Sequence, residues 1–247
     1  MKVTLLQWNV WYEEKIKNII KVIKELNPDI VCLQEIDLNS EHNDYKNVPE
    51  EIAKSLKYHH FYKPSMKFKN KKGWEFLGNG IYSKFPLLSQ KMTYIQKPSG
   101  IDDYDKQGRI YIEAKIKLGK KLLTIGTVHV SYSHRFEITS RKIEEVDKLV
   151  KIIKKKQKMF ILTGDMNSKP SSYTVKQLEK FLKNSGPNYT QKTWTTKPFD
   201  YKGFNETKLR WRLDYVFASK DIHVIKSKII KTKFSDHLPI LVEFEFI

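Results

Sequence analysis

The sequence predicts an α/β fold in which strands outnumber helices and the helices cover the faces of the sheets. Three observations support it: helical apolar stripes alternate with short apolar runs, a central stretch alternates like a hairpin, and the chain closes on three strand-like segments. The 247 residues contain no linker-like composition and no repeat. We therefore expect one domain covering residues 1–247, long enough to bury a sizeable core.

The N-terminal part of the chain predicts a strand–helix–strand unit. Residues 2–10 and residues 29–35 are apolar runs typical of strands. Between them, residues 13–26 begin with two acids, end at Asn27-Pro28 and carry an apolar stripe at helical spacing. A helix that joins two strands implies that the strands pair in parallel. The stripe comprises Ile16, Ile19, Ile20, Ile23 and Leu26.

The later elements follow from the same periodicities. Residues 49–56 predict a short helix, and residues 78–88 predict a strand closed by Phe85-Pro86. Residues 109–130 alternate around Leu118-Gly119-Lys120, which indicates a hairpin. We then expect a helix over 136–157, a buried strand over 159–165, a helix over 174–184, a polar loop over 185–207 and strands over 212–219, 222–230 and 238–246. The stripe of the long helix comprises Ile138, Val146, Leu149, Ile152 and Ile153.

The net charge points to a polyanionic partner. Lys and Arg number 46 against 28 Asp and Glu, which leaves +18. The excess is clustered over 63–74, 151–158 and 226–234, a pattern that favours nucleic acid first and anionic lipid headgroups second. A lysine-rich proteome is the compositional alternative. In the first cluster, Phe68 and Trp74 either stack on exposed bases or belong to the core.

Composition also limits the location of the protein. No apolar run approaches the roughly 20 residues of a membrane helix, and the N-terminus enters a strand pattern without a signal-peptide core. Cys32 is the only cysteine, so no intramolecular disulfide can form. We expect an intracellular, cytoplasmic protein that does not bind membranes, with a monomer as the default state.

Polar side chains fall at the ends of the predicted strands. Each has an ordinary explanation: Asn9 and Asp165 suit turns, and His129 alone suits a structural hydrogen bond. Asp214 is harder to explain, because a carboxylate inside an apolar strand must be paired or ligated. Strand ends in such sheets commonly carry ligand-binding groups, so the set predicts one convergent polar site. Its members are Asn9, Glu35, His129, Asp165, Asn167, Asp214, Asp236 and His237.

These motifs resemble the endonuclease/exonuclease/phosphatase (DNase I-like) superfamily. The resemblance rests on LQWNV, LQE, TVHV, GDMN, RLDYVF and SDHLPI, which occur in family order between residues 5 and 240. It implies a four-layer α-β-β-α sandwich, with two packed mixed sheets flanked by helices. It also implies cleavage of phosphate esters that depends on a divalent metal, Mg²⁺ with Mn²⁺ as a possible substitute.

The resemblance assigns roles to individual residues. Glu35 matches the principal metal carboxylate, with Asn9 and Asp236 beside it, as oxygen ligands suit Mg²⁺. Asp165 matches the carboxylate that orients the attacking water, and Asn167 the amide that holds phosphoryl oxygens. The matching phosphate-contacting imidazole is His237, oriented by Asp214, and His129 matches a second phosphate-contacting or general-acid histidine. The candidate substrate contacts are Arg109, Trp211 and Asn79, with a scaffold role as the alternative for Arg109 and Asn79.

The substrate is less closely defined than the reaction. The predicted function is hydrolysis of nucleic acid, with DNA favoured over RNA, in the manner of an AP endonuclease or a tyrosyl-DNA phosphodiesterase. WRLDY at 211–215 favours the first group, whereas His129 and the TWTT run favour the second. A phospholipid or inositol-phosphate hydrolase and an inactive nucleic-acid-binding module are the alternatives. We expect the loops over 37–48, 63–78, 97–108 and 185–207 to shape the substrate groove.

Overall fold

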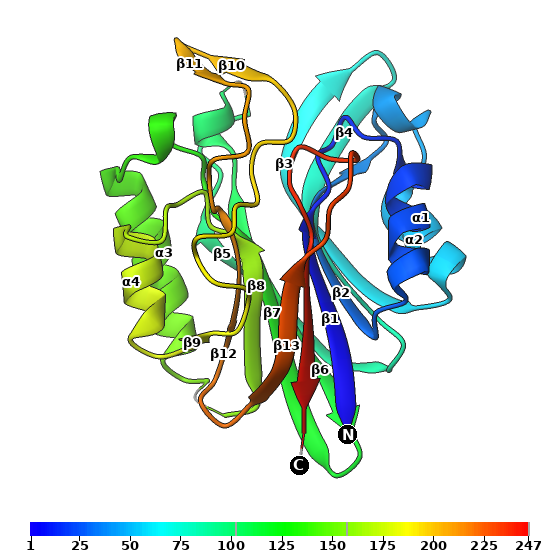
Figure 1. The fold of residues 1–247 in the computed structure, drawn as a ribbon. Coiled ribbons are helices and arrows are strands. Elements are labelled where there is room, and N and C mark those ends of the chain that lie inside the picture. Colours follow the sequence, from blue (N-terminus) through cyan, green and yellow to red (C-terminus); the bar gives the residue numbers. More distant parts are fainter. Residues whose placement is uncertain (102, 157, 247) are drawn as a thin grey trace.

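Two six-stranded mixed sheets pack face to face, and helices cover both outer faces (Figure 1). This computed structural model describes residues 1–101, 103–156 and 158–246. The first sheet has the order β13 (His223–Ile229), β14 (Ile240–Glu245), β1 (Lys2–Asn9), β2 (Ile30–Leu38), β4 (Gly73–Ser83), β3 (His59–Asn70). The second has the order β5 (Leu87–Gln96), β6 (Arg109–Leu118), β7 (Lys121–His129), β8 (Phe160–Asp165), β12 (Asp214–Ala218), β9 (Lys183–Asn184). The predicted four-layer sandwich is confirmed.

In the described part of the chain, four α-helices form the outer layers. Helices α1 (Ile16–Leu26) and α2 (Val48–Leu56) lie on the first sheet, and α3 (Ser140–Ile153) and α4 (Tyr173–Glu179) lie on the second (Figure 1). The predicted stop at Asn27 is confirmed, because Asn27 adopts a left-handed conformation and caps the last turn of α1. Among the described residues, no helix is both long and apolar enough to cross a membrane.

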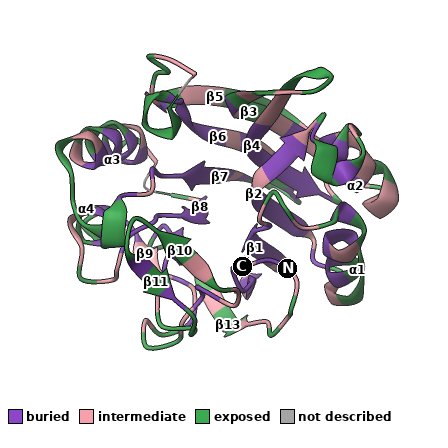
Figure 2. Cartoon of the chain, turned by 90° about the horizontal axis from the view of Figure 1, so that it is seen from above, coloured by how far each residue is buried: buried purple, intermediate pink, exposed green. Residues whose placement is uncertain are grey.

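Three apolar layers hold the sandwich together. One lies between the sheets and includes Leu5, Ile112 and Val216; the other two lie between each sheet and its helices. Figure 2 shows the buried strands running through the middle, with buried helix faces turned toward them. Each fully buried aliphatic side chain contributes roughly 1.5–3 kcal/mol of transfer free energy. The strands are therefore a rigid support for whatever their ends carry.

Parallel pairing brings strand ends to the same edge. Strand β1 pairs in parallel with β2, as predicted, and places Asn9 opposite Gln34. Strand β7 pairs in parallel with β8 and places His129 opposite Asp165. Both crossovers pass through a helix, α1 and α3 respectively. Asn9, His129 and Asp165 are thus strand ends that lie at one end of the sandwich, and Gln34 lies beside Asn9 within β2.

Two long strands are not predicted from the sequence. Residues 59–70 form β3, so the region 63–78 is a β-hairpin with β4 and not a loop, and residues 87–96 form β5. Both are edge strands, and their exposed polar positions hide the strand period. Pro64 is tolerated in β3 because it lies at a register shift. The core explanation also fails for Trp74, which is 37% exposed near the tip of this hairpin.

Several predicted boundaries were also wrong. Helix α3 begins only at Ser140, capped by Thr139, so Ile138 precedes the helix and is exposed; residue 157, its predicted end, lies outside the described residues. Helix α4 ends at Glu179, and residues 183–184, within its predicted range, pair with β12 as β9. The polar loop over 185–207 contains a small hairpin, β10 (Phe199–Tyr201) and β11 (Phe204–Glu206).

Candidate active site

The sequence predicts Glu35 at the end of a strand, but in the structure a bulge within β2 places it. Strand β2 continues to Leu38, but its register with β4 shifts between Leu33 and Ile36, and Glu35 has a left-handed φ of 58°. A bulge of this kind re-aims the side chain that it carries. The carboxylate of Glu35 consequently points along the sheet edge toward Asn9.

The amide of Asn9 joins carboxylates that come from both sheets. Asn9 Nδ2 donates to Glu35 Oε1 at 2.8 Å and to Asp165 Oδ2 at 3.1 Å. Its own Oδ1 accepts from the backbone N–H of Trp11. Asn9 is fully buried and Asp165 is 1% exposed, so the hydrogen bond between them is interior, whereas the Glu35 side chain is partly exposed. Glu35 therefore lies within one amide group of Asp165, which brings the two sheets' strand ends into a single site.

The GDMN segment turns sharply at the end of β8. Gly164 has φ +152°, and a Cβ there would lie 2.1 Å from the carbonyl oxygen of Val128. Asn167 N donates to Asp165 Oδ1 at 2.8 Å, which fixes the carboxylate against its own loop. Asn167 Nδ2 donates to the Val130 carbonyl and lies 3.0 Å from His129 Nε2. The turn thus aims the side chains of Asp165 and Asn167 into the same space.

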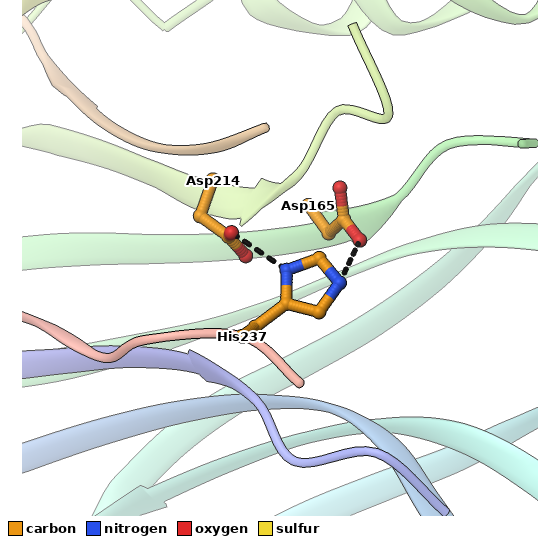
Figure 3. A group of neighbouring side chains, drawn as sticks. All are labelled: Asp165, Asp214 and His237. Atoms are coloured by element: carbon orange, nitrogen blue, oxygen red, sulfur yellow. Dashed lines mark hydrogen bonds and ion pairs between the residues drawn. The ribbon is translucent and has the colours of Figure 1, made fainter. Parts of the chain in front are cut away.

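His237 lies between two carboxylates (Figure 3). Its Nδ1 donates to Asp214 Oδ2 at 2.8 Å, and its Nε2 lies 3.6 Å from Asp165 Oδ2. Asp214 is the first residue of β12 and pairs directly across from Asp165. Burial alone would lower the pKa of His237, but the carboxylates of Asp214, Asp236 and Asp165 outweigh it and raise the pKa well above its ordinary value. The imidazole is therefore held as a cation.

The SDH segment before β14 is braced by two tryptophans. Trp8 Nε1 donates to the His237 carbonyl at 2.9 Å, and Trp194 Nε1 donates to Asp236 Oδ2 at 2.8 Å. Ser235, with a left-handed φ of 67°, accepts the N–H of His237 on its hydroxyl. Asp236 and His237 are thereby fixed on one turn, with Asp236 Oδ2 4.0 Å from His237 Nε2. Asp236 also lies near enough to Glu35 to raise the pKa of that carboxyl, after burial as the main cause.

The electrostatics of the remaining groups describe a pocket rich in acceptors. His129 Nε2 lies 3.6 Å from Asp165 Oδ2 and 3.9 Å from Glu35 Oε1. Burial, with the nearby positive charges of Arg109 and His237, lowers the pKa of His129 well below its ordinary value, so its ring is neutral. Burial raises the pKa of Asp165 to about 7, although the charge of His237 opposes the rise. Neighbouring acceptor atoms of this kind need a shared proton or a cation between them.

The donor set fits a divalent cation. Carboxylate oxygens such as those of Glu35 and Asp236 are ligands that Mg²⁺ prefers, and Asn9 would add its Oδ1 with its amide turned so that Oδ1 in place of Nδ2 faces Glu35. Candidate ligand atoms of Asp165, Asp214 and His237 also lie within 4.8 Å of one another. Asp214 Oδ1 is buried and, among the described residues, accepts no hydrogen bond. The charged ring of His237 has no free lone pair for a metal, so Glu35, Asn9 and Asp236 fit the cation better than this second group does.

Among the described residues, the three predicted substrate contacts make no hydrogen bond to this cluster, although the charge of Arg109 acts on His129. Arg109 is 1% exposed, stacks under Tyr104 at 4.4 Å and donates from Nη1 to the Gly108 carbonyl. Within the described part of the chain, its Nε and Nη2 have no partner. Asn79 is buried and donates to the carbonyl of Ile110 in the facing sheet, which favours the scaffold role for it. Trp211 is half-buried in an aromatic cluster with Phe136, Trp194 and Phe204.

Lys142 was not identified from the sequence. It projects from α3, is 1% exposed and donates from Nζ to the carbonyl of Asn167 at 2.6 Å and to Ser133 Oγ at 2.9 Å. Burial lowers its pKa to about 8. A lysine in an amphipathic helix normally belongs to the solvent face, so nothing in the sequence pattern distinguishes it. Its ammonium group thus stabilises the GDMN turn through a hydrogen bond to the backbone of that turn.

Comparison with known proteins identifies the family. The family model described as Endonuclease/Exonuclease/phosphatase family matches residues 6–237. No curated protein sequence matches the chain.

Solved structures share the fold at low sequence identity, which by itself shows the fold alone. An endonuclease/exonuclease/phosphatase from Beutenbergia cavernae has a TM-score of 0.74 at 17% identity, covering 98% of this chain and 71% of that one. The Bacteroides thetaiotaomicron mannosyl-6-phosphatase has 0.68 at 16%, covering 99% and 100%. D. rerio TDP2 complexed with single strand DNA product has 0.68 at 17%, covering 99% of each chain. Since the family model spans nearly the whole sequence, this protein belongs to the endonuclease/exonuclease/phosphatase family of phosphoric ester hydrolases.

Proposed function

We propose that this protein is a divalent-metal-dependent phosphodiesterase that hydrolyses nucleic acid, with DNA preferred over RNA. The observation that carries the proposal is the contact of Asn9 with both Glu35 and Asp165, next to the His237–Asp214 pair. The site therefore holds a group of acceptor atoms next to a fixed positive charge, that of the His237 ring. Cleavage of a phosphodiester requires both, because the attacking water must lose a proton while negative charge builds on the phosphoryl oxygens.

The chain's own residues then divide the work. Asp165 orients the attacking water and accepts its proton, and burial keeps that carboxylate basic enough for the task. The charged ring of His237 and the amide of Asn167 bind the phosphoryl oxygens as charge develops there. Burial lowers the pKa of His129 and keeps its ring neutral, so His129 contacts the phosphate and does not act as the general acid. Asp214 fixes the orientation and charge of His237.

A metal ion completes the site in this proposal. Glu35, Asn9 and Asp236 would hold a divalent cation, Mg²⁺ or Mn²⁺ in its place. When bound, the ion supplies a Lewis acid for the phosphate and its leaving oxygen.

The preference for nucleic acid rests on charge and on one structural relative. The net charge of +18 suits a polyanion. TDP2, whose solved complex contains a single strand DNA product, has the same fold. We include repair-type substrates, an abasic site or a 5′-tyrosyl end, within the proposal. We further propose that the 247 residues act as one monomeric intracellular domain; light scattering at the chain mass of 29.3 kDa tests the monomer.

A cleavage panel with Mg²⁺ tests the proposed function. The substrates are plasmid, abasic duplex, 5′-tyrosyl oligonucleotide, RNA, sphingomyelin, inositol phosphates and a sugar phosphate, each with wild type and with Asp165→Asn as the matched control. The proposal expects metal-dependent cleavage of DNA that the control lacks. Cleavage of lipid or sugar phosphate alone would replace nucleic acid as the substrate, and no cleavage of anything with either metal would favour the inactive binding module.

A further inference from the structure

The hairpin of β3 and β4 extends past the candidate active site. Gly78 of β4 pairs with Ile36, the residue after Glu35, and the two strands continue to a tip at residues 70–73. At about 3.3 Å per residue, the tip lies roughly 17 Å beyond the level of Glu35. Figure 1 shows β3 and β4 rising beside the top of the sandwich, on the first sheet. A polymeric substrate that extends from the site along this edge of the first sheet would therefore lie against the hairpin.

The outer part of the hairpin is strongly basic. Residues 63–76 contain five lysines and one acid, Glu75, and all five lysines are exposed. Lys71 pairs with Glu41 at 3.2 Å. Within the described residues, no carboxylate lies within ion-pair distance of Lys67 or Lys69. Their ammonium groups instead lie over the ring of Trp74, at 4.8 and 5.8 Å from its centroid.

A hollow beside Trp74 completes the feature. It has a volume of about 400 Å³ and lies between the hairpin tip and the loop that carries Tyr45. Trp74 and Tyr45 line it together with Asn39 and Asn70. Lys72 lies over the Tyr45 ring at 3.9 Å. Aromatic faces, amides and ammonium groups in one small hollow match the three parts of a nucleotide: ring, base edge and phosphate.

We propose that this basic hairpin binds a single-stranded segment of nucleic acid that leads from the active site, with one unpaired base in the hollow against Trp74. The base stacks on the part of the Trp74 ring that lines the hollow, and Lys67 and Lys69, whose ammonium groups lie over the same ring, move onto the flanking phosphates. A paired base cannot reach the ring, since its faces are already stacked within the duplex. This inference rests on the proposed function and extends it to a defined substrate form.

The test measures binding to the full-length chain in chelator, so that nothing is cleaved. A labelled single-stranded oligonucleotide of about 12 nucleotides is followed by fluorescence anisotropy. Trp74→Ala should weaken its binding by about 5- to 150-fold, while Trp74→Phe retains most of the affinity. Lys67→Gln with Lys69→Gln should lower the slope of log K against log salt by about 1.4, or 0.7 for each lost phosphate contact. A duplex of equal length should bind Trp74→Ala as it binds wild type.

The control pair is Lys120→Gln with Lys121→Gln, two exposed lysines at the β6–β7 turn, where the strands end opposite the site. Hydrolysis of bis(4-nitrophenyl) phosphate, too small to reach the hairpin, should be the same in every variant and reports the active site separately. Single-strand binding by Trp74→Ala within twofold of wild type, or an equal slope change in the control pair, would overturn the inference. Binding to anionic phospholipid vesicles is measured for the same variants. If they lose vesicle binding but keep single-strand binding, the hairpin is a membrane contact and not a nucleic-acid site. Absence of diester hydrolysis in wild type would instead count against the proposed function.

Discussion

Replacing Gly164 by alanine tests whether the turn after β8 is built to aim Asp165. The backbone there has φ +152°, which costs a residue with a side chain about 1–3 kcal/mol. The new Cβ would also lie 2.1 Å from the Val128 carbonyl oxygen, a backbone atom that cannot rotate away, and overpacking of this kind costs about 1–3 kcal/mol more. The sum is about 2–6 kcal/mol of unfolding free energy.

Thermal unfolding is the assay, because each kcal/mol shifts the midpoint by about 2–4 °C in a chain of this size. We expect Gly164→Ala to unfold about 8–16 °C below wild type, taking a central cost of about 4 kcal/mol. The matched control is Gly119→Ala at the β6–β7 turn, where φ is +60° but no atom lies within 4 Å of the new Cβ. Its cost is the backbone term alone, about 1–2 kcal/mol.

The same variant should lose activity, because a shift of about 1 Å in Asp165 can cost 10²-fold in rate. A difference of 2 °C corresponds to at most about 1 kcal/mol on this scale. If Gly164→Ala unfolds within about 2 °C of the Gly119→Ala control, the steric argument is refuted. Near-native activity together with a large loss of stability would show that the turn does not position the carboxylate.

Three further predictions concern charged groups. Asp214→Asn should leave the fold intact but lower the rate by about 10²- to 10⁴-fold, because His237 loses the 2.8 Å partner that supports its charge. Steady-state kinetics and thermal unfolding measure the two effects. A rate within threefold of wild type would show that Asp214 does not support His237 in the reaction. Glu35→Gln should raise the Mg²⁺ concentration for half-maximal activity at least about 10-fold, and an unchanged Mg²⁺ titration would remove Glu35 from the ligand set. Lys142 has a folded pKa of about 8, below its ordinary 10.5, so the unfolded chain binds more protons between these values and stability rises with pH there. Relative to Lys142→Met, wild type should gain up to about 3 kcal/mol between pH 8 and 10.5 in urea unfolding, and parallel pH profiles would contradict the burial argument.

The parts of the fold that the sequence predicts are those whose burial follows a simple period. Strands β1 and β2 are nearly continuous apolar runs, and α1 carries its stripe on one face, so their pattern is visible without coordinates. Strands β3 and β5 lie at sheet edges and expose most of their polar side chains, which removes the alternation that a strand reading needs. Ile138 misled for a related reason: helical spacing alone cannot show that Thr139 caps the helix one residue later.

The candidate site divides in the same way. Asn9, His129, Asp165 and Asp214 lie at strand ends, where polar residues interrupt apolar runs and are conspicuous. Glu35 was recognised as a residue, but its bulge was not, because the register between β2 and β4 is a property of the pair and not of either segment. Lys142 and the aromatic cluster around Trp194 depend on loops that fold back over the strand ends. Such contacts are tertiary, and no local pattern records them.

The most direct test of the central claim is the initial rate of DNA hydrolysis by wild type and by Asp165→Asn across a Mg²⁺ titration, with both proteins shown to unfold at similar temperatures. We expect a rate in wild type that is absent without Mg²⁺ and saturates as the ion is added. Asp165→Asn should be slower by about 10²- to 10⁴-fold at every concentration. Equal rates in the two proteins, or wild-type hydrolysis that persists in chelator, would contradict the claim that these strand ends form a metal-assisted phosphodiesterase site.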